Sequence, residues 1–327
     1  MDSHISTQVA EFLGLNEVDI VGMAQRAPHT YRHYKIPKKS GRGMRTIHHP
    51  SKETKSLQYA LMHLLEDALQ PHGCATAYIK RASPLRRNAE IHATRAYLLR
   101  VDFKDFFPSI QPADVFAVLE DERNQARFTL SMADKDFLTS VLFAKNSKGL
   151  LGLPIGAPSS PLVSNGVMRT LDSSIESYAK SRDFLYTRYA DDLVFSTDQK
   201  GLSRPFLEGL REVISRAEHP RLEVNEEKTL FMSRNCRRAV TGLIIGPDGS
   251  LSIGRKRKRY IRKLLQDFRR HKLSEKECHH LQGHLAFILD AEPSFFDRLC
   301  LKYGAENVVG ALKMRGDRFA ARSVENT

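Results

Sequence analysis

Tyr186-Thr-Arg-Tyr-Ala-Asp-Asp-Leu-Val-Phe-Ser196 is the stretch that decides the fold of this chain. Two runs rich in β-branched and aromatic residues meet at Asp191 and Asp192, a pattern that predicts a hairpin with a tight acidic tip. Two carboxylates ~4 Å apart repel each other by roughly 4 kcal/mol at the effective dielectric typical of protein surfaces, whereas a divalent cation turns this repulsion into attraction. Mg²⁺ prefers such oxygen ligands and completes its coordination with water and substrate phosphates. The pair therefore indicates a nucleotide substrate, with a merely solvated acidic turn as the alternative.

A third acid follows a predicted strand. The run Tyr97-Leu-Leu-Arg-Val101 has the composition of a buried strand and ends at Asp102. An acid at the end of an apolar strand is unfavourable unless it has a partner. We therefore expect Asp102 to lie beside the hairpin, so that Asp102, Asp191 and Asp192 together hold two cations ~3.5–4 Å apart.

The charge balance favours a polyanionic partner. The 327 residues include 51 Lys plus Arg against 38 Asp plus Glu, a net charge of +13. Nucleic acid is the simplest such partner, and an indifferent basic surface is the alternative. Cys74, Cys236, Cys278 and Cys300 show no paired ligand spacing, so we expect reduced thiols of a cytoplasmic protein. No apolar run approaches the ~18 residues of a membrane span, and we expect no signal peptide.

Two basic segments are candidates for the nucleic-acid contact. The first is a predicted hairpin with strands at 31–37 and 44–48, and its loop contributes Lys38, Lys39 and Arg42. The second opens a predicted helix with seven basic residues in nine, from 255 to 263. Its expected RNA contacts are Arg255, Lys256, Arg257, Lys258, Arg259 and Arg262. A solvated basic surface is the alternative for both segments.

The other segments predict mostly helices. Apolar spacing predicts a core-facing helix over 51–69, and Pro112 is typical of a first helical turn. The loop at 149–161 leads into another predicted helix, whereas residues 74–95 read as a loop. The turn Gly246-Pro-Asp-Gly249 predicts a hairpin between strands at 239–245 and 250–253. Cys278, His279, His280 and His284 fall around a helix axis, which argues against a metal site.

Four motifs occur in the order found in reverse transcriptases, and the chain resembles that family over about residues 30–320. They are Asp102 with the following Phe106-Phe-Pro-Ser109, Leu153-Pro-Ile-Gly-Ala-Pro-Ser-Ser-Pro161, Tyr189-Ala-Asp-Asp192 and Asn225-Glu-Glu-Lys-Thr229. Two further segments resemble signatures of the bacterial retron enzymes: Asn88-Ala-Glu-Ile-His92 and Val240-Thr-Gly242. The resemblance implies an α+β right-hand polymerase. Its expected parts are an N-terminal helical segment at 1–30, fingers at 31–95, a palm at 96–238 with finger helices inserted, and a primer-grip hairpin with a helical thumb at 239–327. The palm would be an antiparallel sheet backed by helices.

The resemblance also implies roles for single residues. Asp102, Asp191 and Asp192 would bind two Mg²⁺ ions, and Lys228 would act near the leaving pyrophosphate. The implied nucleotide site consists of Arg45 on the triphosphate, Phe103 through its backbone, Phe107 as the gate against a 2′-hydroxyl, and the loop residues Ile155 and Gly156. The implied RNA contacts besides the basic segments are Asn88, His92, Val240, Thr241 and Gly242. Ile155 stands where many relatives have Gln, which predicts altered nucleotide selection without loss of activity.

By resemblance, the implied function is that of a retron reverse transcriptase. Such an enzyme binds its cognate structured non-coding RNA, primes from a guanosine 2′-hydroxyl, and copies part of the RNA from dNTPs into single-stranded DNA that stays linked to it (msDNA). A separate effector protein in anti-phage defence is the implied partner, and a host RNase H would remove copied RNA. The alternatives are a diversity-generating or abortive-infection reverse transcriptase, and a non-catalytic RNA-binding module.

Overall fold

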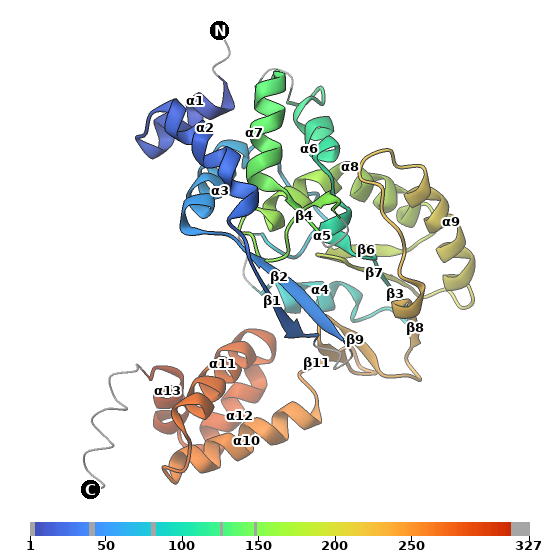
Figure 1. Cartoon of the computed structure of the whole chain (residues 1–327). Coiled ribbons are helices and arrows are strands. Elements are labelled where there is room, and N and C mark those ends of the chain that lie inside the picture. Colours follow the sequence, from blue (N-terminus) through green and yellow to red (C-terminus); the bar gives the residue numbers. More distant parts are fainter. Residues whose placement is uncertain (1–3, 39–42, 80–82, 125–126, 147–148, 315–327) are drawn as a thin grey trace, which may run out of the picture. The chain divides into compact units, whose positions relative to one another are not determined.

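The computed structural model describes residues 4–38, 43–79, 83–124, 127–146 and 149–314 (Figure 1). The chain divides into two compact units. Unit 1 comprises residues 1–80 and 99–231, and unit 2 comprises residues 81–98 and 232–327. Both units mix helices with antiparallel strand pairs, which confirms the α+β class. The division into four segments drawn from the sequence stays a prediction. Among the described residues, no helix is both long and apolar enough to cross a membrane.

The first part of unit 1 contains the predicted basic hairpin. Its elements are α1 (Ile5–Leu13), α2 (Glu17–Arg26), the 3₁₀ helix η1 (Ala27–His29), β1 (Arg32–Pro37), β2 (Met44–His49) and α3 (Lys52–Leu65). β1 and β2 pair antiparallel from Arg32 opposite His49 to Pro37 opposite Met44. The Ser51 side chain accepts a hydrogen bond from Thr54 N at 3.1 Å and so caps α3. The hairpin and the core-facing helix are therefore confirmed.

The second part of unit 1 carries the main sheet. Its elements are β3 (Tyr97–Asp102), α5 (Phe106–Ser109), α6 (Pro112–Leu119), α7 (Met132–Leu142), β4 (Ala144–Lys145), β5 (Leu151–Gly152), α8 (Ser160–Lys180), β6 (Leu185–Tyr189), β7 (Asp192–Thr197), α9 (Ser203–Ser215), the 3₁₀ helix η2 (Glu226–Lys228) and β8 (Leu230–Ser233). The strand order is β6-β7-β3-β8. β6 and β7 pair antiparallel, with Tyr189 opposite Asp192, so the predicted hairpin with an acidic tip is confirmed.

Helices cover this sheet because their apolar side chains and those of the strands pack into one hydrophobic core. α8 packs on β6 and α9 packs on α8 (Figure 1). Val167, Leu171 and Ile175 of α8 are buried together with Phe195 of β7. Burial of such side chains is the main stabilising contribution, at roughly 1.5–3 kcal/mol for each large one. The sheet is thereby a firm support for the residues at its strand ends.

Unit 2 differs from the sequence-based expectation in two places. Its elements are α4 (Pro84–His92), β9 (Arg238–Val240), β10 (Leu243–Ile245), β11 (Leu251–Ser252), α10 (Arg255–Arg269), α11 (Glu275–Ala291), α12 (Pro293–Tyr303) and α13 (Ala305–Leu312). Residues 84–92, expected as a loop, form a helix, because Pro84 suits the first turn and packing on β9, β10 and α11 stabilises it. The strand expected over 239–245 is split by a turn at Thr241 and Gly242. The hairpin across Gly246–Gly249 is confirmed.

That turn explains the Val-Thr-Gly signature physically. Val240 pairs with Leu243, so Thr241 and Gly242 form a two-residue hairpin turn with φ of 49° and 84°. Positive φ at both positions is typical of type I′ turns. The Thr241 hydroxyl donates to Leu85 O of α4 at 2.8 Å, across 156 positions of sequence. The two signature segments are therefore parts of one packed structure.

Candidate active site

Two neighbouring strands bring the three acids together. β3 and β7 lie side by side in the sheet, so Asp102 at the end of β3 is close to Asp191 and Asp192 at the start of β7. The backbone closes the contact, because Phe103 N donates to Asp191 O at 3.2 Å. The Asp102 side chain is 7% exposed. The expected juxtaposition of a strand end with the acidic turn is thus present.

The charged forms of Asp191 and Asp192 are disfavoured at this site. Burial raises the pKa of Asp191, and the charge of Asp102 raises it further. Burial, followed by repulsion from Asp191, raises the pKa of Asp192 to about 6. Arg100 opposes this effect, with its Nε 4.0 Å from Asp192 Oδ1. A site that disfavours its own charged form in this way gains free energy when a cation binds.

Lys228 occupies part of the acidic site. Its Nζ donates to Asp102 Oδ1 at 2.5 Å, and Asn225 Nδ2 lies 3.5 Å from the same oxygen. The backbone supports this arrangement, since Asn225 N donates to Asp102 O at 2.7 Å. The Lys228 side chain is 52% exposed. The ammonium can therefore swing away without disturbing the core.

The donor set fits a divalent metal, although no ready-made cluster exists. Within the described ranges, no three His, Cys, Asp or Glu side chains are already grouped as metal ligands. Asp102 is paired with Lys228 instead. Burial and repulsion among the three acids raise the pKa of Asp191 and Asp192. Carboxylate oxygens of this kind are the hard ligands that Mg²⁺ and Mn²⁺ prefer. Asp102, Asp191 and Asp192 are thus the residues that would hold the metal.

Aromatic and basic side chains lie near the acids. Phe107 is half-buried, with its ring centroid 6.3 Å from that of Tyr78 and 5.4 Å from that of Phe106. Tyr78 is 50% exposed, and burial followed by the charge of Asp191 raises its pKa. The charge of Arg45 on β2 lowers the pKa of both Asp191 and Tyr78. Tyr78 was missed from the sequence, where a single aromatic in an irregular segment gives no signal.

The loop before α8 is joined to β2. His48 N donates to Ile155 O at 2.8 Å. Gly156 has φ of 116°, and a Cβ there would lie 2.8 Å from Ile47 Cγ2 and 3.0 Å from His48 O. Only glycine allows this close approach. Of the remaining predicted nucleotide contacts, Phe103 is buried and its N–H is already bonded to Asp191.

The predicted RNA contacts fall into different environments. Lys38 is exposed, whereas Lys39 and Arg42 lie outside the described residues. Asn88, His92 and Val240 are completely buried in unit 2, so their placement favours a role in holding structure. Thr241 is half-buried and Gly242 is exposed. RNA contact at these positions stays a prediction.

The basic helix α10 has one apolar and one cationic face. Ile261, Leu264 and Leu265 are buried, whereas the expected RNA contacts Arg255, Lys256 and Arg259 are exposed. Two of the expected contacts are engaged within unit 2. Lys258 Nζ lies 2.5 Å from Glu292 Oε1, and the Arg257 guanidinium lies 4.8 Å from the Phe287 ring centroid.

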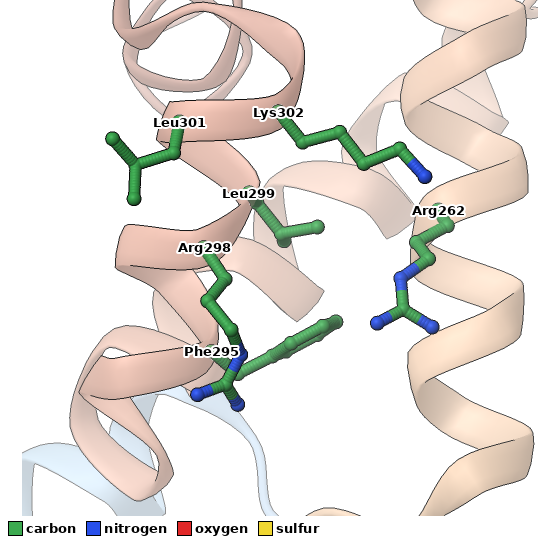
Figure 2. A pocket seen from close by; sticks show the side chains of 6 residues that line it. All are labelled: Arg262, Phe295, Arg298, Leu299, Leu301 and Lys302. Carbon is green, nitrogen blue, oxygen red and sulfur yellow. The ribbon is translucent and has the colours of Figure 1, made fainter.

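A hollow of ≈ 360 Å³ extends the cationic face from α10 to α12 (Figure 2). It is lined by Arg262 of α10 and by Phe295, Arg298, Leu299, Leu301 and Lys302 of α12. Figure 2 shows Lys302 and Arg262 extending into the space between the two helices. The Arg262 guanidinium lies 5.2 Å from the Phe295 ring centroid. Among the described residues, only Arg298 of the three cations has an acidic partner, Glu292 at 3.3 Å.

Comparison with known proteins identifies the family. A family model described as reverse transcriptase (RNA-dependent DNA polymerase) matches residues 36–281. The retron Ec83 reverse transcriptase of Escherichia coli is 35% identical over 300 residues, which span 91% of this chain and 94% of that protein. The retron Ec73 reverse transcriptase of E. coli is 34% identical over 290 residues, 86% of this chain and 89% of that protein. The solved structure of apo telomerase from Candida tropicalis aligns with a TM-score of 0.49 and 13% identity, over 88% of this chain and 62% of that chain.

Proposed function

The chain belongs to the reverse transcriptase family and, within it, to the retron reverse transcriptases, and from this premise we propose that it makes msDNA from its own structured RNA. As a member of that family it is an RNA-directed DNA polymerase that uses an RNA template. In the finer proposal, synthesis starts at the 2′-hydroxyl of an internal guanosine of the cognate non-coding RNA. The product acts with a separate effector protein in anti-phage defence, and a host RNase H removes the copied RNA.

The observation that carries the proposal is the position of Asp102 beside the acidic turn. Polymerisation needs charge stabilisation where the attacking oxygen and the triphosphate meet, and three carboxylates from two adjacent strands supply ligands for that purpose. We assign two Mg²⁺ ions to Asp102, Asp191 and Asp192. When bound, divalent ions neutralise the phosphates and lower the pKa of the attacking hydroxyl.

The protein's own groups position the reactants. The attacking hydroxyl oxygen bonds to the α-phosphorus of the dNTP, and pyrophosphate leaves. Arg45 binds the triphosphate, and the Phe107 ring, supported by Tyr78, fills the space of a ribonucleotide 2′-hydroxyl. Lys228 would leave Asp102 for a bound metal ion and would donate a proton to the departing pyrophosphate. Its 52% exposed side chain has the freedom for this movement.

In unit 2 we assign the RNA contact to the cationic face of α10 together with the hollow beside α12. The cations Arg262, Arg298 and Lys302 around an apolar floor suit an RNA phosphate, with the exposed Leu301 offering contact to a base or ribose. Phosphate contacts of this kind dominate RNA affinity. Recognition of the cognate RNA would then combine this surface with the exposed Gly242 of the β9–β10 turn.

Co-expression with a candidate RNA gives the deciding experiment. The purified complex, supplied with dNTPs and Mg²⁺, should extend a branched DNA from its own RNA, detected by its sensitivity to a 2′,5′-debranching enzyme. Asp191→Asn and Asp192→Asn should each reduce synthesis by at least about 10³-fold while RNA affinity changes less than about twofold, because metal ligation, not RNA binding, is lost.

Glu223→Gln is the matched control, since Glu223 is an exposed acid near the same strand end and, among the described residues, pairs only with Lys104. It should retain wild-type synthesis. An active Asp191→Asn protein would refute the metal assignment. Unbranched DNA from the wild-type complex would refute 2′-hydroxyl priming while leaving the polymerase assignment in place.

A further inference from the structure

A buried ion pair lies beneath the acidic turn. Arg188 of β6 and Asp172 of α8 both have side chains that are 0% exposed. Arg188 Nε donates to Asp172 Oδ1 at 2.9 Å, and Nη2 donates to Oδ2 at 2.7 Å. The Tyr186 hydroxyl donates to the same carboxylate at 2.8 Å. Helix α8 thereby fixes the guanidinium in one orientation.

The opposite side of the guanidinium reaches the backbone of the turn. Arg188 Nη1 donates to Ala190 O at 3.1 Å and to Asn165 Oδ1 at 3.1 Å. Ala190 has φ of 57°, a left-handed conformation that is uncommon for residues with a side chain. Its carbonyl belongs to the peptide that leads into Asp191. Arg188 therefore holds the peptide whose orientation sets the direction of the Asp191 side chain.

The surrounding main chain is held independently. Arg188 N donates to Cys74 O at 2.9 Å, and Arg188 O accepts from Thr76 N at 2.8 Å. On the other side of the turn, Phe103 N donates to Asp191 O at 3.2 Å. Because hydrogen bonds hold both flanks of the turn, the bond from Arg188 to Ala190 O restricts the orientation of the short segment between them.

Stability alone does not account for this pair. Removing two charges from water offsets much of their attraction, so an apolar pair of similar size often packs equally well. An apolar pair, however, cannot donate a hydrogen bond to the Ala190 carbonyl. We propose that Arg188, held by Asp172, is a positioning residue that directs Asp191 toward the metal ions. The proposal rests on the proposed function, because it takes Asp191 as a metal ligand.

The double variant Arg188→Met/Asp172→Leu separates positioning from stability. It removes both charges together, so no unpaired buried charge remains. We expect an unfolding temperature within a few degrees of wild type, a kcat at least tenfold lower, and a Mn²⁺ dissociation constant at least fivefold higher by electron paramagnetic resonance on the nucleotide-free complex. RNA affinity should be unchanged. A folded double variant with wild-type kcat and Mn²⁺ affinity overturns the proposal.

Asp134→Asn is the control for a buried carboxylate in the same unit. Asp134 accepts hydrogen bonds from Ile5 N and Ser131 N at the start of α7, away from the turn. Its loss should lower the unfolding temperature without changing Mn²⁺ affinity or kcat. A similar loss of Mn²⁺ affinity in this control would mean that general destabilisation, not positioning, weakens the site, and would also overturn the proposal.

The amide double variant Arg188→Gln/Asp172→Asn keeps the experiment decisive if the first double variant fails to fold. It again removes both charges together. The asparagine has nearly the shape of Asp172 and can still accept from Tyr186, but the guanidinium that donates to Ala190 O is gone. Smaller losses of kcat and Mn²⁺ affinity are expected, and wild-type values for both overturn the proposal. Asp191→Asn, measured in parallel, distinguishes the two failures. If it is active, the proposed function is wrong; if only the Arg188 and Asp172 variants are unaffected, the positioning role alone is wrong.

Discussion

Lys228 and Asp102 form an ion pair within the proposed metal site. The ammonium sits on Asp102 Oδ1, one of the oxygens that would ligate metal, so the ion pair and the metal compete for the same atom. The same ammonium is the proposed proton donor for pyrophosphate. A single residue would thus weaken metal binding in the resting protein and assist the reaction once metal has bound.

Lys228→Ala should therefore change metal affinity and turnover in opposite directions. We expect Mn²⁺ to bind a few-fold more tightly, because the competing cation is gone, and kcat to fall by about tenfold or more. Calorimetric titration and single-turnover extension measure the two quantities. Lys104→Ala is the control, because Lys104 pairs with exposed Glu223 at 3.2 Å, and it should change neither. Weaker Mn²⁺ binding in Lys228→Ala would show that the lysine does not compete.

His92 makes the stability of unit 2 depend on pH. Burial lowers the pKa of His92 to about 3, whereas an unfolded histidine titrates near its ordinary value of 6.5. Between these values the unfolded chain binds a proton that the folded chain does not, so stability falls as pH drops through this window. From pH 7 to pH 5, wild type should lose about 2 kcal/mol more of its free energy of unfolding than His92→Gln.

Urea unfolding at the two pH values, followed by a probe in unit 2, measures this difference. His280→Gln, at an exposed position of α11, serves as the control and should behave like wild type. Equal pH dependence in wild type and His92→Gln would mean that His92 is protonated in the folded protein.

Single residues were predictable where their chemistry is unusual for their local pattern. Adjacent acids between two apolar strands can be recognised from the sequence alone, and so can an acid that ends a buried strand. Arg188 was missed because an arginine in a strand is ordinarily read as facing solvent. Its partner Asp172 occupies an equally unremarkable helical position, and only the packing of α8 on β6 makes both buried.

At the scale of elements, the junction between β2 and the loop before α8 connects the basic hairpin to the sheet. Gly156→Ala should disturb this junction, since its Cβ would lie 2.8 Å from Ile47 Cγ2 and 3.0 Å from His48 O. Arg45 lies on the same strand, so we expect the KM for dNTP to rise about tenfold and the unfolding temperature to fall by several degrees.

Gly149→Ala is the matched control for this prediction. Gly149 also has positive φ, at 76°, but a Cβ there would meet nothing within 4 Å. Its unfolding temperature should therefore fall because of backbone strain at positive φ, whereas the KM for dNTP should stay unchanged. An equal rise in KM for both variants would assign the effect to backbone strain alone.

Elements with a clear apolar period or with typical turn residues were predictable from the sequence. Helix α4 was not, because it has neither. Its sequence between Arg86 and His92 is mostly polar, so it offers no apolar stripe. Two of the polar side chains, Asn88 and His92, nevertheless face the interior. The turn at Thr241 was missed for a similar reason, because a β-branched residue at φ of 49° contradicts local preference and depends on its bond to α4.

At the scale of the whole molecule, the net charge of +13 favours binding of a polyanion such as RNA. Replacing Arg262, Arg298 and Lys302 with glutamine removes three positive charges from the hollow between α10 and α12. If each contacts a phosphate, the slope of log affinity against log salt should become less steep by roughly 0.7–0.9 per cation. Filter binding of the cognate RNA between about 50 and 200 mM salt measures this slope.

Replacing Lys180, Arg182 and Arg216 with glutamine provides the control, since these exposed cations of unit 1 change the total charge equally. A local contact predicts a changed slope only for the first set. The same change in both sets would mean that overall charge, rather than the hollow, attracts the RNA.

The bond between Thr241 and Leu85 has a consequence for synthesis on the ribosome. Helix α4 emerges early, yet the strands and the helix that cover it are translated more than 150 residues later. Until then, the nascent chain carries Asn88 and His92 without their enclosing partners. Contacts this distant in sequence slow folding. The two segments that resemble retron signatures thus close around each other only after the 156 positions between Leu85 and Thr241 have been translated.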